Sequence, residues 1–353
     1  MTSTPRPPTS TPQALAYAQS GVSRSVPNLL KQFQANTKSL ADPNLLAGIG
    51  PFSAVYQLSS TLSGLKQPLV LASCDGVGTK LVLADEWKDV SGIGQDLVAM
   101  NANDLLCSGA WPLLFLDYFA CSALTESTYL AVLESIGKAC QKAGCLLVGG
   151  ETAQMPGVYA EGKWDLAGFG IGFLDKDSLL GPHRVENGDV LVGLPSSGFH
   201  SNGYTLLRSW IHSHDITPEA KPAWSSDRTW KDLLLAPTLL YKESVLPLVP
   251  KLHSAAHITG GGLFENLERV IPNELKAIVR SHCWPQSDLF AHVQKDLRIS
   301  QMEMLSTFNC GIGMILLAPE SEADFVVEQT HGLYLGHIVK NPSASATARV
   351  EWE

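Results

Sequence analysis

Short apolar runs alternate along the chain with longer segments in which apolar residues recur every three or four positions. In the first half, four apolar runs predict buried strands, at 68–73, 113–119, 145–149 and 166–174. The helical spacing predicts two helices between them, at 93–108 and 126–142. Gly144 is a typical stop for the second helix.

A second series of elements begins near Asp177. Its predicted strands are 189–194, 275–280, 311–317, 334–339 and 347–352, and its predicted helices are 202–212, 238–249 and 320–330. The polar segment 214–230 is expected to be a surface excursion. Both halves are therefore of the α/β or α+β class, and the best boundary lies at 174–182. We expect a tail and arm at 1–45, followed by domains at 46–175 and 176–353.

Composition narrows the class of protein. The chain has 353 residues, 45% of them hydrophobic and 17% charged, as expected for a globular protein with ample core. The net charge of −9 argues against nucleic acid as a partner, and no apolar stretch reaches the ~18–20 residues of a membrane span. The seven cysteines include no C-x-x-C pair, which argues against a zinc site and fits a reducing cytosol.

The N-terminus gives a weaker signal about location. Residues 1–12 are rich in Ser, Thr and Pro and are expected to be disordered. No acidic residue precedes Asp42, as in organelle transit peptides, but this region has only two arginines and no clear amphipathic Arg-rich helix. We therefore expect a cytoplasmic protein, with organelle import as the alternative.

The sequence LASCDGVGTK at 71–80 brings a carboxylate, two glycines, a hydroxyl and a lysine to the end of an apolar strand. Glycines let backbone N–H groups approach a phosphate, Lys80 supplies a point charge, and Asp75 can hold Mg²⁺. The spacing is not that of a P-loop, so a P-loop NTPase is not implied. Taken alone, an ordinary strand and turn is the alternative.

Polar residues also interrupt the helix predicted at 93–108. Asp96 and Asn103 share one helix face about 10 Å apart, and Asp104 lies about 80° further round. One metal ion cannot bind both carboxylates, but a triphosphate that carries Mg²⁺ can span them. An N-cap or a solvated side chain is the alternative for Asp96. Asp104 stands before two leucines, where burial without a partner would be costly.

Two further acids follow the same pattern. Asp117 interrupts an apolar strand, where a charge is normally paired or ligating, and structural and functional interpretations stand about even. Gly149, Gly150 and Glu151 close another apolar strand. Open α/β sheets bind ligands at strand ends, so these acids predict a ligand site.

Two glycine-rich loops in the second half precede predicted helices. SSGFHSNGY at 196–204 includes His200, and HITGGG at 257–262 includes His257. Free N–H groups at a helix start bind anions. For Ser201 or Asn202 taken alone, an N-cap is the better explanation. Together the loops and acids predict a cleft between the two domains.

These motifs resemble the phosphoribosylformylglycinamidine cyclo-ligase family, also called aminoimidazole ribonucleotide synthetases. The matching strings run in family order from about residue 45 to the C-terminus: DGVGTKL (75–81), DLLCSGAWPLLFLDY (104–118), GGETAQMPG (149–157), SSGFHSNGY (196–204), LLAPTLLYKESVL (234–246), HITGGGLFENLERVIP (257–272) and TFNCGIGMIL (307–316). The resemblance implies ATP-dependent closure of formylglycinamidine ribonucleotide to aminoimidazole ribonucleotide. It also implies an α/β N-terminal domain whose strands pair across a homodimer, and a ferredoxin-like α+β C-terminal domain.

The resemblance also implies roles for individual residues. For Mg²⁺ it implies Asp75, Asp104 and Glu151. For ATP and its phosphates it implies Gly76, Gly78, Thr79, Lys80, Asp96, Asn103, Gly149 and Gly150. For the substrate it implies Ser197, Gly198, Ser201, Asn202, Gly203, Thr259, Gly260, Gly261 and Gly262. The catalytic candidates are Asp104, His200, His257 and Lys80, and which histidine acts stays open.

The chain departs from the family pattern near its start. SGVSRS at 20–25 stands where the family has a segment like AGVDID, and AGIGPFS at 47–53 replaces a loop like GGFGG. Pro51 removes a donor, and Ser53 in a glycine-only conformation would cost ~1–3 kcal/mol. Two alternatives follow: a related ATP-dependent enzyme of the same architecture, or a non-catalytic homologue that acts as a binding partner.

Overall fold

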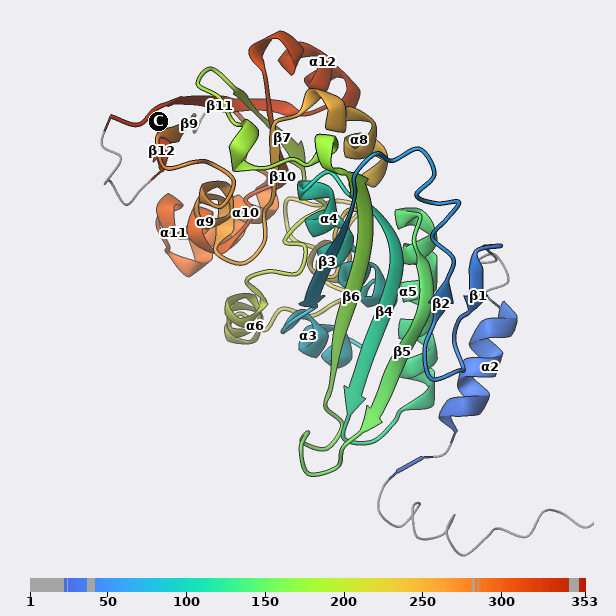
Figure 1. Cartoon of the computed structure of the whole chain (residues 1–353). Helices are drawn as coiled ribbons and strands as arrows, with labels where there is room; N and C mark the ends of the chain where they lie inside the picture. Colours follow the sequence, from blue (N-terminus) through green and yellow to red (C-terminus); the bar gives the residue numbers. More distant parts are fainter. Residues whose placement is uncertain (1–21, 24, 37–41, 281–282, 285, 343–348) are drawn as a thin grey trace, which may run out of the picture.

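The computed structural model describes residues 22–23, 25–36, 42–280, 283–284, 286–342 and 349–353. The expectation for residues 1–12, and part of the divergent segment 20–25, lie outside the described residues. The described chain forms two large sheets, each covered by helices (Figure 1), and a two-stranded sheet near residues 45–56. No helix in this part of the chain combines the length and apolar character needed to cross a membrane.

The N-terminal sheet is a mixed sheet with helices on one face. Within the described residues its order is β3 (Pro68–Gly76), β6 (Trp164–Asp175), β4 (Trp111–Cys121) and β5 (Leu146–Gln154). β4 pairs parallel to β5, while β6 runs antiparallel to both β3 and β4. Helices α4 (Ile93–Cys107) and α5 (Glu126–Ala143) cover one face (Figure 1). The predicted strands and helices of this half are confirmed.

Alternate glycines on β6 explain how closely α4 packs on this sheet. Gly168, Gly170 and Gly172 all face α4, as strand periodicity requires. A Cβ at Gly168 would lie 2.5 Å from the Phe115 ring and 2.9 Å from the Asn101 amide. The missing side chains therefore let the helix approach the sheet backbone.

The C-terminal sheet is mixed and buried on both faces. Within the described residues its order is β12 (Val350–Trp352), β9 (Leu275–Val279), β11 (Leu333–Lys340), β7 (Val190–Pro195), β10 (Ile312–Ala318) and β8 (Ser254–His257). One face packs on α6 (Tyr204–Ser213), α9 (Gly262–Glu268), α10 (Asp288–Leu297) and α11 (Gln301–Thr307). The other face packs on α8 (Lys242–Val245) and α12 (Glu320–Thr330). The α+β class is confirmed, with a larger sheet than a minimal ferredoxin-like domain requires.

Shorter elements connect these layers. They are α2 (Val26–Asn36), β1 (Leu45–Ala47), β2 (Val55–Tyr56), α3 (Lys80–Glu86), α7 (Trp230–Leu234) and the 3₁₀ turns at Lys176–Ser178, Pro182–Arg184 and Leu246–Lys251. β6 ends at Asp175 and β7 begins at Val190, so the boundary that we place after residue 175 falls in the connection between the sheets.

The helix predicted at 238–249 is wrong. Only Lys242–Val245 is α-helical, and a 3₁₀ turn follows it. Pro247 has no N–H to donate within the predicted range, and Pro237 and Pro250 stand just outside its two ends, which explains the break. Because residues 236–241 are not helical, their backbone groups can form hydrogen bonds with another element, helix α4.

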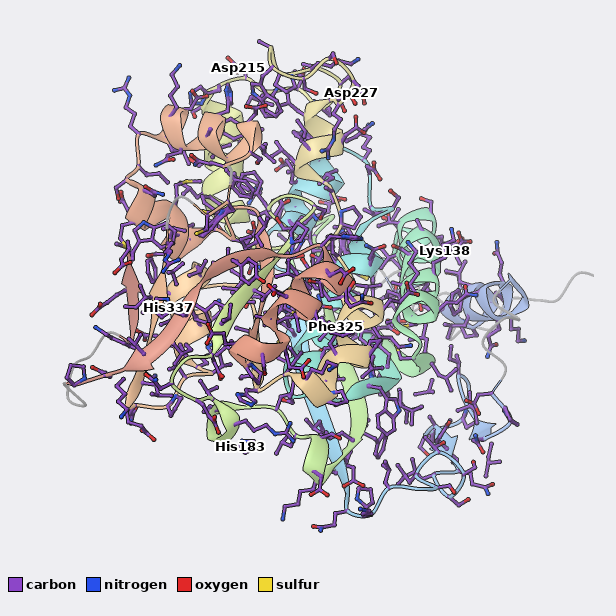
Figure 2. The ribbon with its side chains drawn as sticks, turned by 90° about the horizontal axis from the view of Figure 1, so that it is seen from above. Lys138, His183, Asp215, Asp227, Phe325 and His337 are labelled. Atoms are coloured by element: carbon purple, nitrogen blue, oxygen red, sulfur yellow. The ribbon has the colours of Figure 1, made fainter. Side chains whose placement is uncertain are left out.

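Gly94 offers a test of the packing between α4 and α5. A Cβ at this position would lie 2.2 Å from the backbone nitrogen of Ile136. We expect Gly94→Ala to lower the free energy of unfolding by about 1–3 kcal/mol through overpacking, despite the better helix propensity of alanine. Thermal and denaturant unfolding measure the effect. Lys138→Ala, on the exposed face of α5 (Figure 2), is the control and should change little; equal stability of both variants would contradict this packing.

Candidate active site

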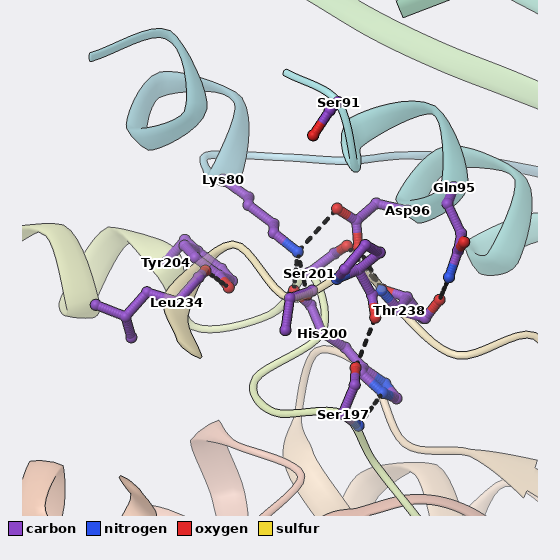
Figure 3. A network of polar contacts seen from close by, with 12 residues as sticks. Lys80, Ser91, Gln95, Asp96, Ser197, His200, Ser201, Tyr204, Leu234 and Thr238 are labelled. Atoms are coloured by element: carbon purple, nitrogen blue, oxygen red, sulfur yellow. Dashed lines mark hydrogen bonds and ion pairs between the residues drawn. The ribbon is translucent and has the colours of Figure 1, made fainter. Parts of the chain in front are cut away.

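Lys80 and Asp96 form a buried ion pair at the junction of the two domains (Figure 3). The Nζ atom of Lys80 lies 2.8 Å from Oδ2 of Asp96, and neither side chain is exposed. Nζ also donates to the backbone oxygens of His200, at 2.9 Å, and Ala236, at 2.8 Å. Burial lowers the pKa of Lys80, and the Asp96 carboxylate opposes that shift. Each ammonium proton has an acceptor, and two of the acceptors belong to the C-terminal domain.

The same face of α4 binds the segment 236–241. The backbone N–H and the hydroxyl of Thr238 each donate to Oδ1 of Asp96, both at 2.7 Å. Two turns further along, the amide of Asn103 donates to the Leu239 oxygen at 2.8 Å. Asp96 and Asn103 therefore share a face, as the helical spacing predicts, and this face docks a loop of the other domain.

This docking changes the interpretation of three predicted ATP contacts. Lys80, Asp96 and Asn103 have their polar atoms bonded to the protein itself. The sequence shows which helix face the two α4 residues share, but it does not show that the C-terminal domain covers that face. Contact of these three residues with nucleotide stays a prediction, and their geometry favours a positioning role.

The glycine-rich turn after β3 lies against the start of α6. Gly78 has a φ of 72°, a conformation that favours glycine, whereas Gly76 still belongs to the strand. The hydroxyl of Thr79 lies 3.0 Å from that of Thr205 in α6. The predicted phosphate turn and the predicted substrate loop of the other domain are therefore neighbours.

Asp104 and His257 form a hydrogen-bonded pair beside this junction, and Asp75 lies near enough for both to influence its pKa. Nδ1 of His257 lies 2.9 Å from Oδ1 of Asp104, whose side chain is 43% exposed. Burial raises the pKa of Asp75, the Gly76 N–H opposes that shift, and the nearby Asp104 carboxylate adds to it. The flanking leucines of Asp104 do pack in cores, but the helix turns the acid itself toward solvent.

The hydrogen bonds of His257 determine where its proton lies. Nε2 faces the amide nitrogen of Asn103 at 3.3 Å, and an amide nitrogen can only donate. Nε2 is therefore the acceptor, and Nδ1 carries the proton that is donated to Asp104. His257 thus orients the Asp104 carboxylate and has no open lone pair.

His200 is fully buried in its loop. The backbone N–H of Ser197 donates to Nε2 of His200 at 3.2 Å, which places the proton of the neutral ring on Nδ1. Burial first, and then the nearby His257 and Lys80, lower the pKa of His200 well below its usual range. Its backbone has a φ of 57°, and Lys80 bonds its carbonyl. His200 is therefore neutral and held in place by the N-terminal domain.

The two predicted substrate loops lie next to each other. The position of a Cβ on Gly260 would be 3.7 Å from the side-chain oxygen of Asn202. Positive φ angles at Gly203, Gly261 and Gly262 turn the chain into α6 and α9. The remaining predicted members, Ser197, Gly198, Ser201 and Thr259, belong to the same two loops.

Two asparagines hold these loops, and the sequence alone indicated a role for neither. The amide of Asn309 donates to the Gly198 oxygen at 2.8 Å. The amide of Asn266 donates to the oxygens of Gly260, at 3.1 Å, and Gly262, at 2.7 Å. The strings that resemble the family contain both residues, but nothing in their spacing indicates which backbone groups they bind.

Glu151 lies apart from the other two predicted metal ligands. The strand prediction ended β5 at residue 149, but the strand continues to Gln154, so Glu151 points from a sheet face rather than from a strand end. Asp75 and Asp117 both lie opposite Gly168 in the strand register, so they share the helix-covered face of the sheet. Gly150 lies opposite Asp117, and side chains alternate along a strand, so Glu151 points from the other face. Within the described residues, no three His, Cys, Asp or Glu side chains are grouped to hold one metal ion.

Glu151, Gly149 and Gly150 instead line a cavity of about 420 Å³ beneath the loop at 48–54. Among residues 47–53, Gly50 alone has a positive φ, of 127°. Ser53 therefore does not occupy a glycine-only conformation, and the strain considered for it does not arise.

Asp75 and Asp104 nevertheless have the chemistry of a magnesium site. Mg²⁺ commonly binds one or two carboxylates and completes its shell with water and phosphate oxygens. Two neighbouring carboxylates, one of them exposed, fit such an ion because a cation relieves their mutual repulsion.

Comparison with known proteins defines the class. The N-terminal domain model of AIR synthase related proteins matches residues 54–174, and the C-terminal domain model matches residues 186–346. A crystal structure of the hydrogenase maturation protein HypE in complex with ATP superposes with a TM-score of 0.67 over 94% of this chain and 92% of that chain, at 20% identity. Thiamine-monophosphate kinase from Stenotrophomonas maltophilia K279a gives 0.64, with 92% and 95% covered, also at 20% identity. At these identities the likeness shows the fold alone.

Sequence relatives define the family. The phosphoribosylformylglycinamidine cyclo-ligase of Polaromonas sp. is 43% identical over 318 residues, which cover 89% of this chain and 90% of the relative. The human trifunctional purine biosynthetic protein adenosine-3 is 40% identical over 351 residues, 96% of this chain but 34% of that protein, so the chain spans about a third of such relatives. The chain belongs to the phosphoribosylformylglycinamidine cyclo-ligase family.

The ion pair at the junction gives a direct prediction. Lys80→Met leaves Asp96 buried without its cation, and we expect a loss of about 3–5 kcal/mol in the free energy of unfolding. Adding Asp96→Asn should recover part of the loss, because the amide oxygen of the substituted side chain can still accept from Thr238. Denaturant unfolding measures both.

The control is the more exposed pair of Arg208 and Glu86, whose charged atoms lie 3.3 Å apart. Arg208→Ala should cost less than about 1 kcal/mol. A similarly small loss for Lys80→Met would show that the buried pair does not hold the domains together.

Proposed function

We propose that this chain is an ATP-dependent ligase that closes formylglycinamidine ribonucleotide to aminoimidazole ribonucleotide in purine synthesis, with release of ADP and phosphate. Relatives named phosphoribosylformylglycinamidine cyclo-ligase share 40–43% of its residues over most of its length. The observation that carries the proposal is the convergence of acids from β3 and α4 with the His257 end of β8. These residues lie in the strings by which the chain resembles the family.

The chemistry requires a better leaving group on the formamide carbon. Transfer of the γ-phosphoryl group to the formamide oxygen provides it, and the ribosyl-bearing amidine nitrogen then attacks the same carbon. A C–N bond forms, the C–O bond to the phosphorylated oxygen breaks, the nitrogen loses a proton, and phosphate departs. The protein must therefore align the donor, acceptor and nucleophile and neutralise phosphate charge.

Asp75 and Asp104 are the residues that would hold Mg²⁺. When bound, this ion neutralises charge on the phosphates of ATP. His257 keeps the Asp104 carboxylate oriented by its donated hydrogen bond, and Asn103 keeps His257 in the tautomer that can donate. The hydrogen bonds of His257 favour a positioning role over proton transfer. His200 is fully buried, which favours a positioning role for this residue as well.

The loops of the C-terminal domain are proposed to bind the ribonucleotide substrate. The backbone N–H groups of 198–203 and 259–262 precede α6 and α9, and a helix start favours phosphate. Lys80 fixes the first loop through the His200 carbonyl. Glu151, Gly149 and Gly150 are proposed to contact ATP from their cavity on the far side of the sheet.

A substrate-dependent assay tests the activity. Purified protein should release ADP from Mg²⁺–ATP when formylglycinamidine ribonucleotide is present, and not in its absence. Asp104→Asn should reduce that rate by roughly a hundredfold or more, because a charge facing the phosphates is lost, with little change in melting temperature for so exposed a side chain. Glu134→Gln on the exposed face of α5 is the control.

Three outcomes would count against these assignments. ADP release that ignores the substrate would contradict the reaction, and no turnover at all would favour a binding protein. Near wild-type turnover of Asp104→Asn would remove that residue from the site.

The bare face of the N-terminal sheet supports a homodimer. Val70 and Phe169 point away from α4 and are 67% and 41% exposed. Leu114 and Leu116 share this face by strand register. An uncovered apolar sheet face usually marks an interface, and the family resemblance implies pairing of these strands. All seven cysteines are free, which supports a reducing compartment such as the cytosol.

Charges on this face should separate the subunits. We expect the wild type to have the mass of a dimer in light scattering, and the double variant Val70→Asp with Phe169→Asp to have that of a monomer. Met302→Asp, at a 52% exposed site on α11, should leave the mass unchanged. A monomeric wild type, or an undissociated double variant, would refute an interface here.

A further inference from the structure

A small, largely apolar pocket lies at the β5 edge of the N-terminal sheet. Helices α2 and α5 form its walls together with Ile49 and β5, and its volume is about 170 Å³. Its apolar lining residues are Val26, Leu30, Phe33, Ile49, Leu133 and Leu147. A water molecule takes up about 30 Å³ in the liquid, so the pocket has room for about six, or for one flat bicyclic ring.

The pocket opens toward the cavity proposed for ATP. Both cavities share six residues in their linings: Leu30, Ile49, Asp117, Gly149, Gly150 and Glu151. A ligand with an apolar ring at one end and a charged chain at the other can therefore place the ring in the pocket and the chain in the wider cavity.

Asp117 is the polar group of this pocket that the protein leaves without a partner side chain. The residue is 7% exposed, and the only hydrogen bond of its carboxyl among the described residues comes from its own backbone N–H. The other polar lining groups are engaged: the Tyr129 hydroxyl lies 2.7 Å from that of Thr152, and Glu151 accepts from the Thr152 N–H at 2.9 Å. A buried carboxyl without partners is costly, so a function for it needs a ligand.

Because Gly150 has no side chain, it leaves space for the Asp117 carboxyl. A Cβ at Gly150 would lie 2.3 Å from Oδ1 of Asp117. Burial raises the pKa of Asp117 to about 7. The other titratable groups around it are Tyr129 and Cys140 on α5 and Glu151 on β5, and none of them supplies a positive charge. In its protonated form the carboxyl presents one donor and one acceptor side by side.

We propose that Asp117 recognises the amino-bearing edge of the purine base of ATP, an inference that rests on the function proposed above. Adenine offers a donor, its 6-amino group, beside an acceptor, N1. This edge matches a protonated carboxyl in two hydrogen bonds, in which the hydroxyl donates to N1 and the carbonyl oxygen accepts from the 6-amino group, whereas a purine base without the 6-amino group keeps only the first of them. The apolar walls from α2 and α5 supply the two faces against which the ring packs.

Base selectivity tests the proposal. Phosphate release that depends on formylglycinamidine ribonucleotide is measured with ATP and with purine ribonucleoside triphosphate, which lacks the 6-amino group, and the ratio of their kcat/KM values is compared. We expect the wild type to favour ATP by roughly tenfold to a hundredfold, the cost of leaving one buried acceptor unpaired. Asp117→Asn, which keeps one donor and one acceptor, should retain the ratio within about threefold. Asp117→Leu, which has a side chain of similar size without polar atoms, should lower kcat/KM with ATP and so bring the ratio close to one.

Two further variants complete the design. Ser122→Ala, just beyond the end of β4, removes a buried hydroxyl outside the pocket and should leave the ratio unchanged. Leu30→Trp fills the pocket from the half-buried face of α2 and should raise KM for both nucleotides at least tenfold. This second variant keeps the test valid if Asp117→Leu fails to fold.

The outcomes separate this proposal from the function on which it rests. A wild type without base preference, an unchanged ratio in Asp117→Leu, or an unchanged KM in Leu30→Trp would each overturn it. If the wild type shows no substrate-dependent phosphate release, the proposed function fails. Calorimetric binding of ATP and of purine ribonucleoside triphosphate to the same variants then decides the role of Asp117 by the same ratios.

Discussion

The ion pair between Lys80 and Asp96 is the contact on which the arrangement of the proposed site depends. Two charges without exposed surface stay buried only when their geometry and remaining hydrogen bonds are satisfied. Here those bonds come from the His200 and Ala236 carbonyls and from Thr238, so satisfying the pair requires the C-terminal domain. The same requirement brings the loop that contains His200 over the turn after β3, and it leaves Asp104 exposed beside His257.

Much of the fold could be predicted from local pattern. The strands of the N-terminal sheet followed from apolar runs, even β6 with its glycines, and the two long helices followed from their spacing. The failure at 238–249 has a local cause in three prolines whose effect the apolar spacing concealed. The candidate residues of the second half also proved to lie in two adjoining loops, as their motifs suggested.

The roles of individual polar residues were less predictable, because they depend on contacts far away in the sequence. Helical geometry put Asp96 and Asn103 on one face, but it could not reveal that residues 236–241 cover them. The apolar run placed Glu151 just beyond a strand end, but the strand continues five residues further, to Gln154, so Glu151 points from a sheet face. Asn266 and Asn309 bind backbone oxygens, which leave no trace in side-chain patterns.

Helix α4 packs in the cores of both domains, and this affects how the protein unfolds. Leu97 of this helix packs in the N-terminal core, and Leu106 packs in the core beneath β7 and β10. Unfolding of either domain would remove the packing partners of one side of α4. The domain boundary in the sequence is therefore not a boundary between two independently unfolding units. The halves should behave as one unfolding unit, and a fragment cut between them would carry a helix with half of its partners missing.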